Sequence, residues 1–166
     1  MTEYPPAPPP PPQQPGAYGP PPGGPSGPRA GFGVRLVAVI VDSIILLIAS
    51  GIVVGIVYAM VGEDGAIISG YAAFILGTFA YFTFFEGGPS GQSPGKKALS
   101  IRVIDFNTGG PIGYGRALGR ILFRWFISSF VCYLGYLWML WDREKQTWHD
   151  KVCTCVVVPT DAYPVP

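Results

Sequence analysis

The chain has 166 residues, of which 49% are hydrophobic and only 13% are charged, and its mean hydropathy is +0.35. Soluble domains carry about 25% charged residues, so this composition indicates that lipid forms part of the solvent. The formal net charge of +1 and the absence of a basic tail give no indication of nucleic-acid binding. The three cysteines, Cys132, Cys153 and Cys155, are an odd number and do not predict a disulfide framework.

The first 30 residues are rich in proline and glycine. Residues 1–28 contain thirteen of the nineteen prolines, including the run from Pro8 to Pro12. Such a segment favours polyproline II and coil over a packed core. It also lacks the basic and apolar regions of a secretory signal peptide. We therefore expect residues 1–30 to be a disordered cytoplasmic tail, either solvated or docked in an aromatic-lined groove of a partner.

Three apolar segments follow the tail, at residues 34–61, 66–85 and 121–141. A helix needs about 20 residues to cross a hydrocarbon core of about 30 Å. The first two segments meet this length, and the turn at 62–65 predicts that they form an antiparallel hairpin. The third contains Arg124, and its uncharged part is short, so the sequence leaves open whether it crosses or re-enters. The expected fold class is an all-α membrane protein with about three hydrophobic helical segments.

The distribution of basic residues predicts the orientation. The 62–65 turn has no lysine or arginine, whereas the connection from 86 to 120 has five: Lys96, Lys97, Arg102, Arg116 and Arg120. We therefore expect a multi-pass membrane protein, with the 86–120 connection and the N-terminus in the cytoplasm.

Two short segments have the composition of β-strands. Residues 98–106 alternate apolar with polar or branched side chains, and residues 153–158 form a valine-rich run. A lone strand leaves its backbone groups unpaired, so we expect these two segments to pair in a small cytoplasmic β element. If all three apolar segments crossed the membrane, the two strand segments would lie on opposite sides of it. Their expected pairing therefore favours a third apolar segment that does not fully cross.

Basic residues in the connection are expected to face the membrane surface. Arg116, Arg120 and Arg124 are spaced by four residues and share one face of a helix predicted over 114–126. Such a helix is expected to lie in the interface. The residues expected to be basic and lipid-facing on the cytoplasmic side are Lys96, Lys97, Arg116 and Arg120.

A carboxylate inside the first apolar segment is the most unusual feature of the chain. Asp42 lies seven residues after Arg35, so the two side chains share one helical face. A charge in an apolar span costs roughly 2.5–3.5 kcal/mol, so both residues should face inward. Seven residues rise about 10.5 Å, which disfavours a direct Arg35–Asp42 pair and favours a polar site completed by a third group.

Several ordered motifs resemble those of the RDD family of small bacterial membrane proteins, and they cover residues 31–158. They are Arg35 with Asp42, Gly91–Lys97, Ile101–Asp105 and Gln146–Lys151. The arginine and two aspartates that name the family correspond to Arg35, Asp42 and Asp150. The proline-rich tail is similar to that of actinobacterial members, although the segment around Cys155 departs from the family's usual ending. Residues 159–166 are expected to be a short flexible C-terminal tail.

The resemblance implies a polar intramembrane network of Arg35, Asp42 and Asp150, supported by Arg124 or His149. Three interpretations of this network are open, and the least favoured of them is a ligand-binding site. The other two are a structural network that ties the helices together and a proton or cation site at Asp42. A metal centre is not expected, because His149 is the only histidine and Cys-x-Cys is not a standard zinc spacing. Gly51 and Gly55 form a small-x3-small face for helix packing.

We expect a non-enzymatic protein without a cofactor, because the sequence contains no evident set of nucleophile, base and orienting group. The resemblance implies an accessory or assembly component of a larger membrane complex, for example an actinobacterial respiratory assembly. The alternative is a small oligomeric secondary transporter or cation/proton exchanger that uses the Arg/Asp site. The expected partners are membrane lipids and either other membrane subunits or a second copy of the chain.

Overall fold

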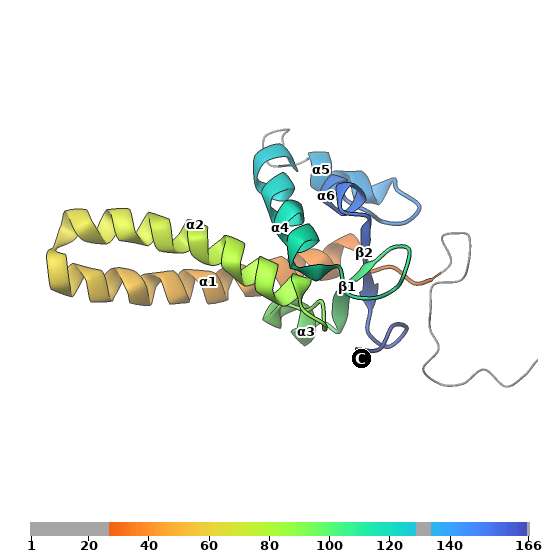
Figure 1. Ribbon diagram of the computed structural model, residues 1–166, viewed down its shortest axis with the longest axis horizontal. Coiled ribbons are helices and arrows are strands. Elements are labelled where there is room, and N and C mark those ends of the chain that lie inside the picture. The colour runs from red at the N-terminus through yellow and green to blue at the C-terminus, as the bar shows by residue number, and fades with distance from the viewer. Residues whose placement is uncertain (1–26, 129–133, 166) are drawn as a thin grey trace, which may run out of the picture.

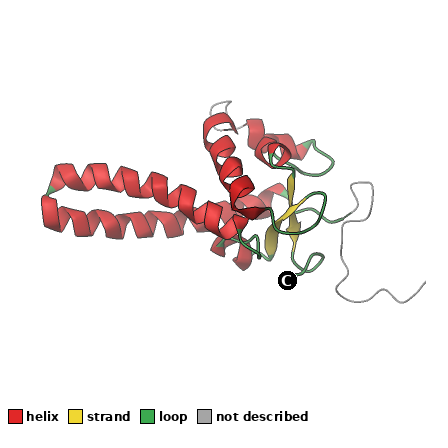
Figure 2. Cartoon of the chain, viewed as in Figure 1, coloured by secondary structure: helices red, strands yellow, loops and turns green. Residues whose placement is uncertain are grey.

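The computed structural model describes residues 27–128 and 134–165, and it divides into a long helical hairpin and a smaller body (Figures 1 and 2). The hairpin consists of α1 (Phe32–Val61) and α2 (Glu63–Gly87). The body contains α3 (Pro94–Ala98), β1 (Ile101–Asp105), α4 (Gly113–Phe123), a π-helical turn (Arg124–Ser128), α5 (Leu134–Leu137), a 3-10 turn (Trp138–Leu140), α6 (Trp148–Val152) and β2 (Cys155–Pro159).

The predicted hairpin is confirmed. α1 and α2 have 30 and 25 residues, and their most apolar stretches have mean hydropathies of 2.8 and 1.6. Both are long enough to cross a bilayer. Gly62 ends α1 and begins α2 at a φ of 82°, a conformation that glycine adopts without strain. Only 6% of the α1 stretch and 11% of the α2 stretch are buried within the chain, so lipid or another protein must cover the rest.

The third apolar segment does not form a continuous spanning helix in the described part of the chain. α4 has 11 residues, which rise only about 16 Å, and the π-helical turn follows directly. Beyond it, α5 and α6 lie beside α4 and return the chain to the sheet (Figure 1). The predicted count of three segments is therefore not confirmed, and two helices among the described residues qualify as candidate spans.

This return allows the predicted strand pairing, which is confirmed. β1 and β2 are antiparallel, with Val103 opposite Val157. One face of the sheet packs against helix residues such as Ala38 and Ala117. The other face is covered by residues that include Tyr163. The sheet thus lies at the base of the hairpin and holds the C-terminal strand beside it.

Both predicted tails are only partly described. Residues 1–26 of the expected N-terminal tail lie outside the described residues, whereas the Ala30 backbone N–H donates to the Val157 carbonyl at 3.0 Å. At the other end, the Thr160 N–H donates to the Ser100 carbonyl at 2.8 Å. The described parts of both ends therefore contact the sheet.

Candidate functional site

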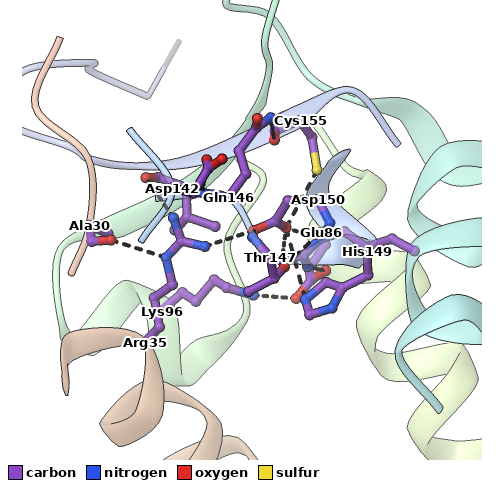
Figure 3. Close-up of polar contacts among 12 residues, drawn as sticks. Ala30, Arg35, Glu86, Lys96, Asp142, Gln146, Thr147, His149, Asp150 and Cys155 are labelled. Carbon is purple, nitrogen blue, oxygen red and sulfur yellow. Dashed lines mark hydrogen bonds and ion pairs between the residues drawn. The ribbon is translucent and has the colours of Figure 1, made fainter. Parts of the chain in front are cut away.

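Eight titratable side chains are buried together where the hairpin meets the body, and Figure 3 shows several of them in close-up. We call this set the ion network: Arg35, Asp42, Glu86, Lys96, Arg120, Arg124, His149 and Asp150. Its members come from α1, α2, α3, α4, the π-helical turn and α6.

Asp150 is the centre of the network. Its α6 begins with a capping box, because Thr147 Oγ1 accepts from the Asp150 N–H and the Asp150 carboxylate accepts from the Thr147 N–H. The same carboxylate accepts a hydrogen bond from Arg35 Nη1 at 2.7 Å. It also accepts a hydrogen bond from Arg120 Nε at 2.9 Å and forms an ion pair with Arg120 Nη2 at 2.8 Å. Of the two aspartates in the expected network, Asp150 is the one that Arg35 contacts.

Arg35 joins the start of α1 to the sheet as well as to α6. Its Nε donates to the Ala30 carbonyl at 3.1 Å, and its Nη2 donates to the Val157 carbonyl at 3.5 Å. The planar guanidinium therefore serves three acceptors at once, a geometry that a lysine ammonium does not reproduce.

The arginines set the charge state of Asp150. Burial by itself would raise the pKa of the Asp150 carboxyl, but the positive charges of Arg120 and Arg35 outweigh this and hold the pKa well below its usual value. Asp150 is thus an anion at every physiological pH, compensated by two guanidinium groups.

Glu86 forms a second centre that the sequence analysis missed. It is 1% exposed, and its two carboxylate oxygens pair with Lys96 Nζ and Arg120 Nη1. A buried carboxylate at the end of an apolar helix requires such partners. The available signal was that Glu86 is an isolated acid directly before a connection rich in lysine and arginine.

These contacts correct the expectation that Lys96 and Arg120 face lipid. Both are buried, at 3% and 4% exposure, because Glu86 draws them inward. Lys97 is exposed. Arg116 is also exposed and pairs with Asp105 at the end of β1. The four-residue spacing of the arginines therefore indicated a shared face correctly but not what that face contacts.

Asp42 is buried on the inner face of α1, as expected, but it holds a loop rather than an arginine. Its Oδ1 accepts from Tyr81 Oη at 2.8 Å and from the Gly95 N–H at 2.7 Å, and its Oδ2 accepts from Ser93 Oγ at 2.5 Å. A side chain at Gly95 would place its Cβ 2.3 Å from the Ala38 carbonyl oxygen. Asp42 thus anchors the start of α3 against α1.

The expected supporting residues, Arg124 and His149, both belong to the network. The Arg124 guanidinium lies 4.2 Å from the centre of the Phe82 ring, in a cation–π contact. His149 Nε2 lies 3.9 Å from an Asp150 oxygen, and its ring packs edge-on against Tyr136. Burial lowers the pKa of His149 well below its usual value, so the imidazole is neutral at pH 7.

The remaining sequence-predicted positions lie outside the network. Gly51 and Gly55 are exposed, and an added Cβ would meet no atom within 4 Å at either one, so neither packs α1 against α2. Cys153 and Cys155 are buried free thiols, and burial raises the pKa of Cys155 well above its usual value. Among the described residues, no group of three or more side chains could hold a metal ion.

The ion network has the properties of a clamp. Each of its carboxylates accepts at least two hydrogen bonds or ion pairs, and together these contacts link α1, α2, α3, α4 and α6. Removing one partner of a buried pair costs about 3–5 kcal/mol. The arrangement therefore rigidifies the base of the hairpin.

Known proteins match this region of the chain. The family model described as "RDD family" matches residues 29–154. A protein of Mycobacterium tuberculosis named "Proline-rich antigen homolog" is 40% identical over 87 residues, which cover 51% of this chain and 36% of the relative. The "Proline-rich antigen" of Mycobacterium leprae is 39% identical over 75 residues, which cover 45% and 30%. The matches thus span about a third of the length of these relatives. No solved structure matches the chain.

Proposed function

We propose that this chain, which belongs to the RDD family, is a non-enzymatic accessory or assembly component of a larger membrane complex. Its family membership and its two apolar helices indicate that it is a membrane protein. In this proposal the ion network holds the protein's own fold, and the hairpin provides the surface that a partner subunit contacts.

The placement of charge carries the proposal. From Ser43 to Val61 in α1, and from Ala66 to Phe85 in α2, neither helix contains a charged residue. All members of the ion network lie at the base of the hairpin, where it meets the body, and not at the end with the Gly62 turn. A single copy therefore has no chain of ionisable groups along these two helices, which disfavours transport by the monomer and favours a structural role.

The exposed surface of the hairpin is suited to contact with a partner protein. Gly51 and Gly55 leave a shallow strip on α1, bordered by exposed aliphatic side chains such as Ile52 and Ile56. Small residues of this kind let helices approach closely in membranes. Because none of the described residues packs on this strip at Gly51 or Gly55, a second protein has access to it.

The test is purification from the native membrane in a mild detergent, followed by identification of bound proteins. We expect stable membrane subunits to copurify. The variant Gly51→Leu/Gly55→Leu should lose them, whereas the matched control Ile56→Leu should keep them. The proposal is wrong if the wild-type protein emerges alone at every detergent concentration that preserves its fold.

One observation favours the alternative of an oligomeric cation or proton exchanger. Within the described part of the chain, the groups that donate to the Asp42 carboxylate are all neutral, so an ion that binds there displaces no cationic side chain. This alternative predicts pH-dependent cation flux in proteoliposomes, and Asp42→Asn should abolish it while the protein still folds. Undiminished flux in that variant would exclude Asp42 as the ion site.

A further inference from the structure

An open groove with aromatic walls lies on the body, at the connection between α5 and α6, and its volume is about 350 Å³. The residues that line it are Phe106, Trp138, Trp141, Asp142, Arg143 and Glu144. Trp141 is 73% exposed and Trp138 is 45% exposed, so both indole rings are accessible. Trp138 also packs against Trp148, with 6.0 Å between the ring centres, and this contact supports one wall of the groove.

The proline-rich tail joins the body at the edge of this groove. Arg29 Nη2 pairs with Glu144 Oε2 at 2.7 Å, and Arg29 Nε donates to the same oxygen at 2.8 Å. Arg29 Nη1 donates to Tyr163 Oη at 3.3 Å. The residue at which the tail meets the body is therefore held at one wall of the groove.

One acceptor in the groove wall, Glu144 Oε1, is buried and has no hydrogen-bond donor among the described residues. A buried carboxylate oxygen without a donor is costly, so a ligand with an N–H or O–H group is favoured at this wall. Arg143 is exposed in the same groove and provides a positive charge for such a ligand. The groove therefore favours an occupant with apolar surface, a hydrogen-bond donor and a negative charge.

The sequence of the tail has this chemistry. Residues 5–12 are all proline except Ala7, and two glutamines follow them directly. Proline-rich segments favour polyproline II and bind aromatic-lined grooves, because this extended conformation needs little further ordering. The glutamine amides are N–H donors. Glu3, the only charged side chain in residues 1–26, complements the charge of Arg143.

We propose that the proline run, residues 5–12, docks in this groove of its own chain, against Trp138 and Trp141. The run is joined to Arg29 by residues 13–28, which as a flexible coil span about 20–24 Å. Because Arg29 is held at the groove wall, a tether of this length reaches the two tryptophans. It also gives the run an effective concentration on the order of 1 mM at the groove.

A membrane surface is the other occupant that exposed tryptophans favour. The carboxylates of Asp142 and Glu144 in the groove disfavour it, because the headgroup layer of an anionic membrane repels negative side chains. A run that is docked on its own body is not free to bind an aromatic groove of another protein, so such a protein must compete with the body for the tail. This inference is independent of which complex the protein joins.

The experiment is fluorine NMR of the full-length protein in detergent micelles, with fluorotryptophan at its four tryptophans. The run variant replaces residues 5–12 by a Gly/Ser segment of equal length. In it we expect the Trp138 and Trp141 resonances to shift, whereas the Trp125 resonance should stay in place because its ring packs against α2. Replacing residues 20–22, a shorter proline run, by the same composition is the matched control and should shift none of them. Unchanged Trp138 and Trp141 resonances in the run variant would overturn the proposal.

A synthetic peptide of residues 1–14 locates the docking site. It should return the two resonances of the run variant to their wild-type positions. It should bind the wild-type protein several-fold more weakly, because the tethered run competes for the groove. In the run variant, Trp141→Ala should abolish peptide binding, whereas Leu140→Ala, at an exposed position outside the groove, should preserve it. Retained binding in the Trp141→Ala protein would place the run elsewhere and overturn the proposal.

The same resonances decide between the tail and the membrane. With the groove occupied by the run, transfer of the wild-type protein from micelles to nanodiscs with anionic lipid should leave the Trp138 and Trp141 resonances in place. If these resonances shifted on that transfer but not on replacement of the run, the groove would face the membrane and the proposal would be wrong.

Discussion

Gly95→Ala should destabilise the protein strongly, although it adds only one methyl group. The new Cβ would lie 2.3 Å from the Ala38 carbonyl oxygen and 2.8 Å from the Asp42 carboxylate. Carbon–oxygen contacts are ordinarily about 3.3 Å or more, so α3 must move away from α1 by about 1 Å. Overpacking of this kind costs about 1–3 kcal/mol.

The displacement also stretches the Gly95 N–H bond to Asp42, now 2.7 Å long. A hydrogen bond to a charged group contributes about 1.5–3 kcal/mol. Because the carboxylate keeps its other donors, part of this contribution survives, and we expect a total loss of about 3 kcal/mol. For a chain of this length, such a loss lowers the melting temperature by about 6–12 °C.

The assay is thermal unfolding in detergent, followed by tryptophan fluorescence. Gly119→Ala is the control, because its Cβ would meet no atom within 4 Å and the position lies inside α4. Replacing a helix-interior glycine by alanine stabilises by about 0.5–1 kcal/mol, so the two variants should shift in opposite directions. A Gly95→Ala protein that melts at or above the wild-type temperature would refute the close approach of α3 and α1.

Three further predictions concern the ion network. Wild-type stability should decline as the pH falls below about 6.5, because the pKa of His149 is lowered in the fold and only the unfolded chain then takes up the proton. Melting curves from pH 7 to 5 should show this decline, and His149→Gln should remove it. Arg35→Lys should lower stability by about 1.5–3 kcal/mol, because one ammonium cannot donate to Asp150 and to both backbone carbonyls. If this variant melted at the wild-type temperature, the three hydrogen bonds of the Arg35 guanidinium would be contradicted. Lys96→Gln should cost about 3–5 kcal/mol, whereas Lys97→Gln, at an exposed position, should change stability by less than about 0.5 kcal/mol; equal effects in the same melting assay would mean that Lys96 is not buried.

Much of the architecture could be predicted from local patterns. Hydropathy and length predicted the hairpin, and the period-2 pattern with the need for a partner predicted the pairing of β1 and β2. The seven-residue spacing placed Arg35 and Asp42 on one face, and both are buried there. The helices and the polar face of α1 depend on neighbours within a few turns of the chain, whereas the strand pairing could be predicted because each strand needs a partner for its backbone groups.

The third apolar segment shows where local patterns stop being sufficient. Its hydropathy is compatible with a spanning helix, but α4 ends at Phe123, and α5 and α6 return the chain toward β1. Arg124 is buried among the network and contacts Phe82 at this point. Whether an apolar segment with a single charge crosses the membrane or turns back thus depends on the partners that the fold supplies for that charge.

By itself, then, the sequence determined which segments are apolar, which strand segments pair and which face of α1 is polar. Only the tertiary structure decided the partners of the charges. Arg35 meets Asp150 across 115 residues, and Arg120 meets Glu86 across 34. Asp42 turned to the α3 loop instead of an arginine. The physical reason is that the free energy of a buried charge depends on desolvation and on partners within a few ångströms, and both exist only after distant segments have packed.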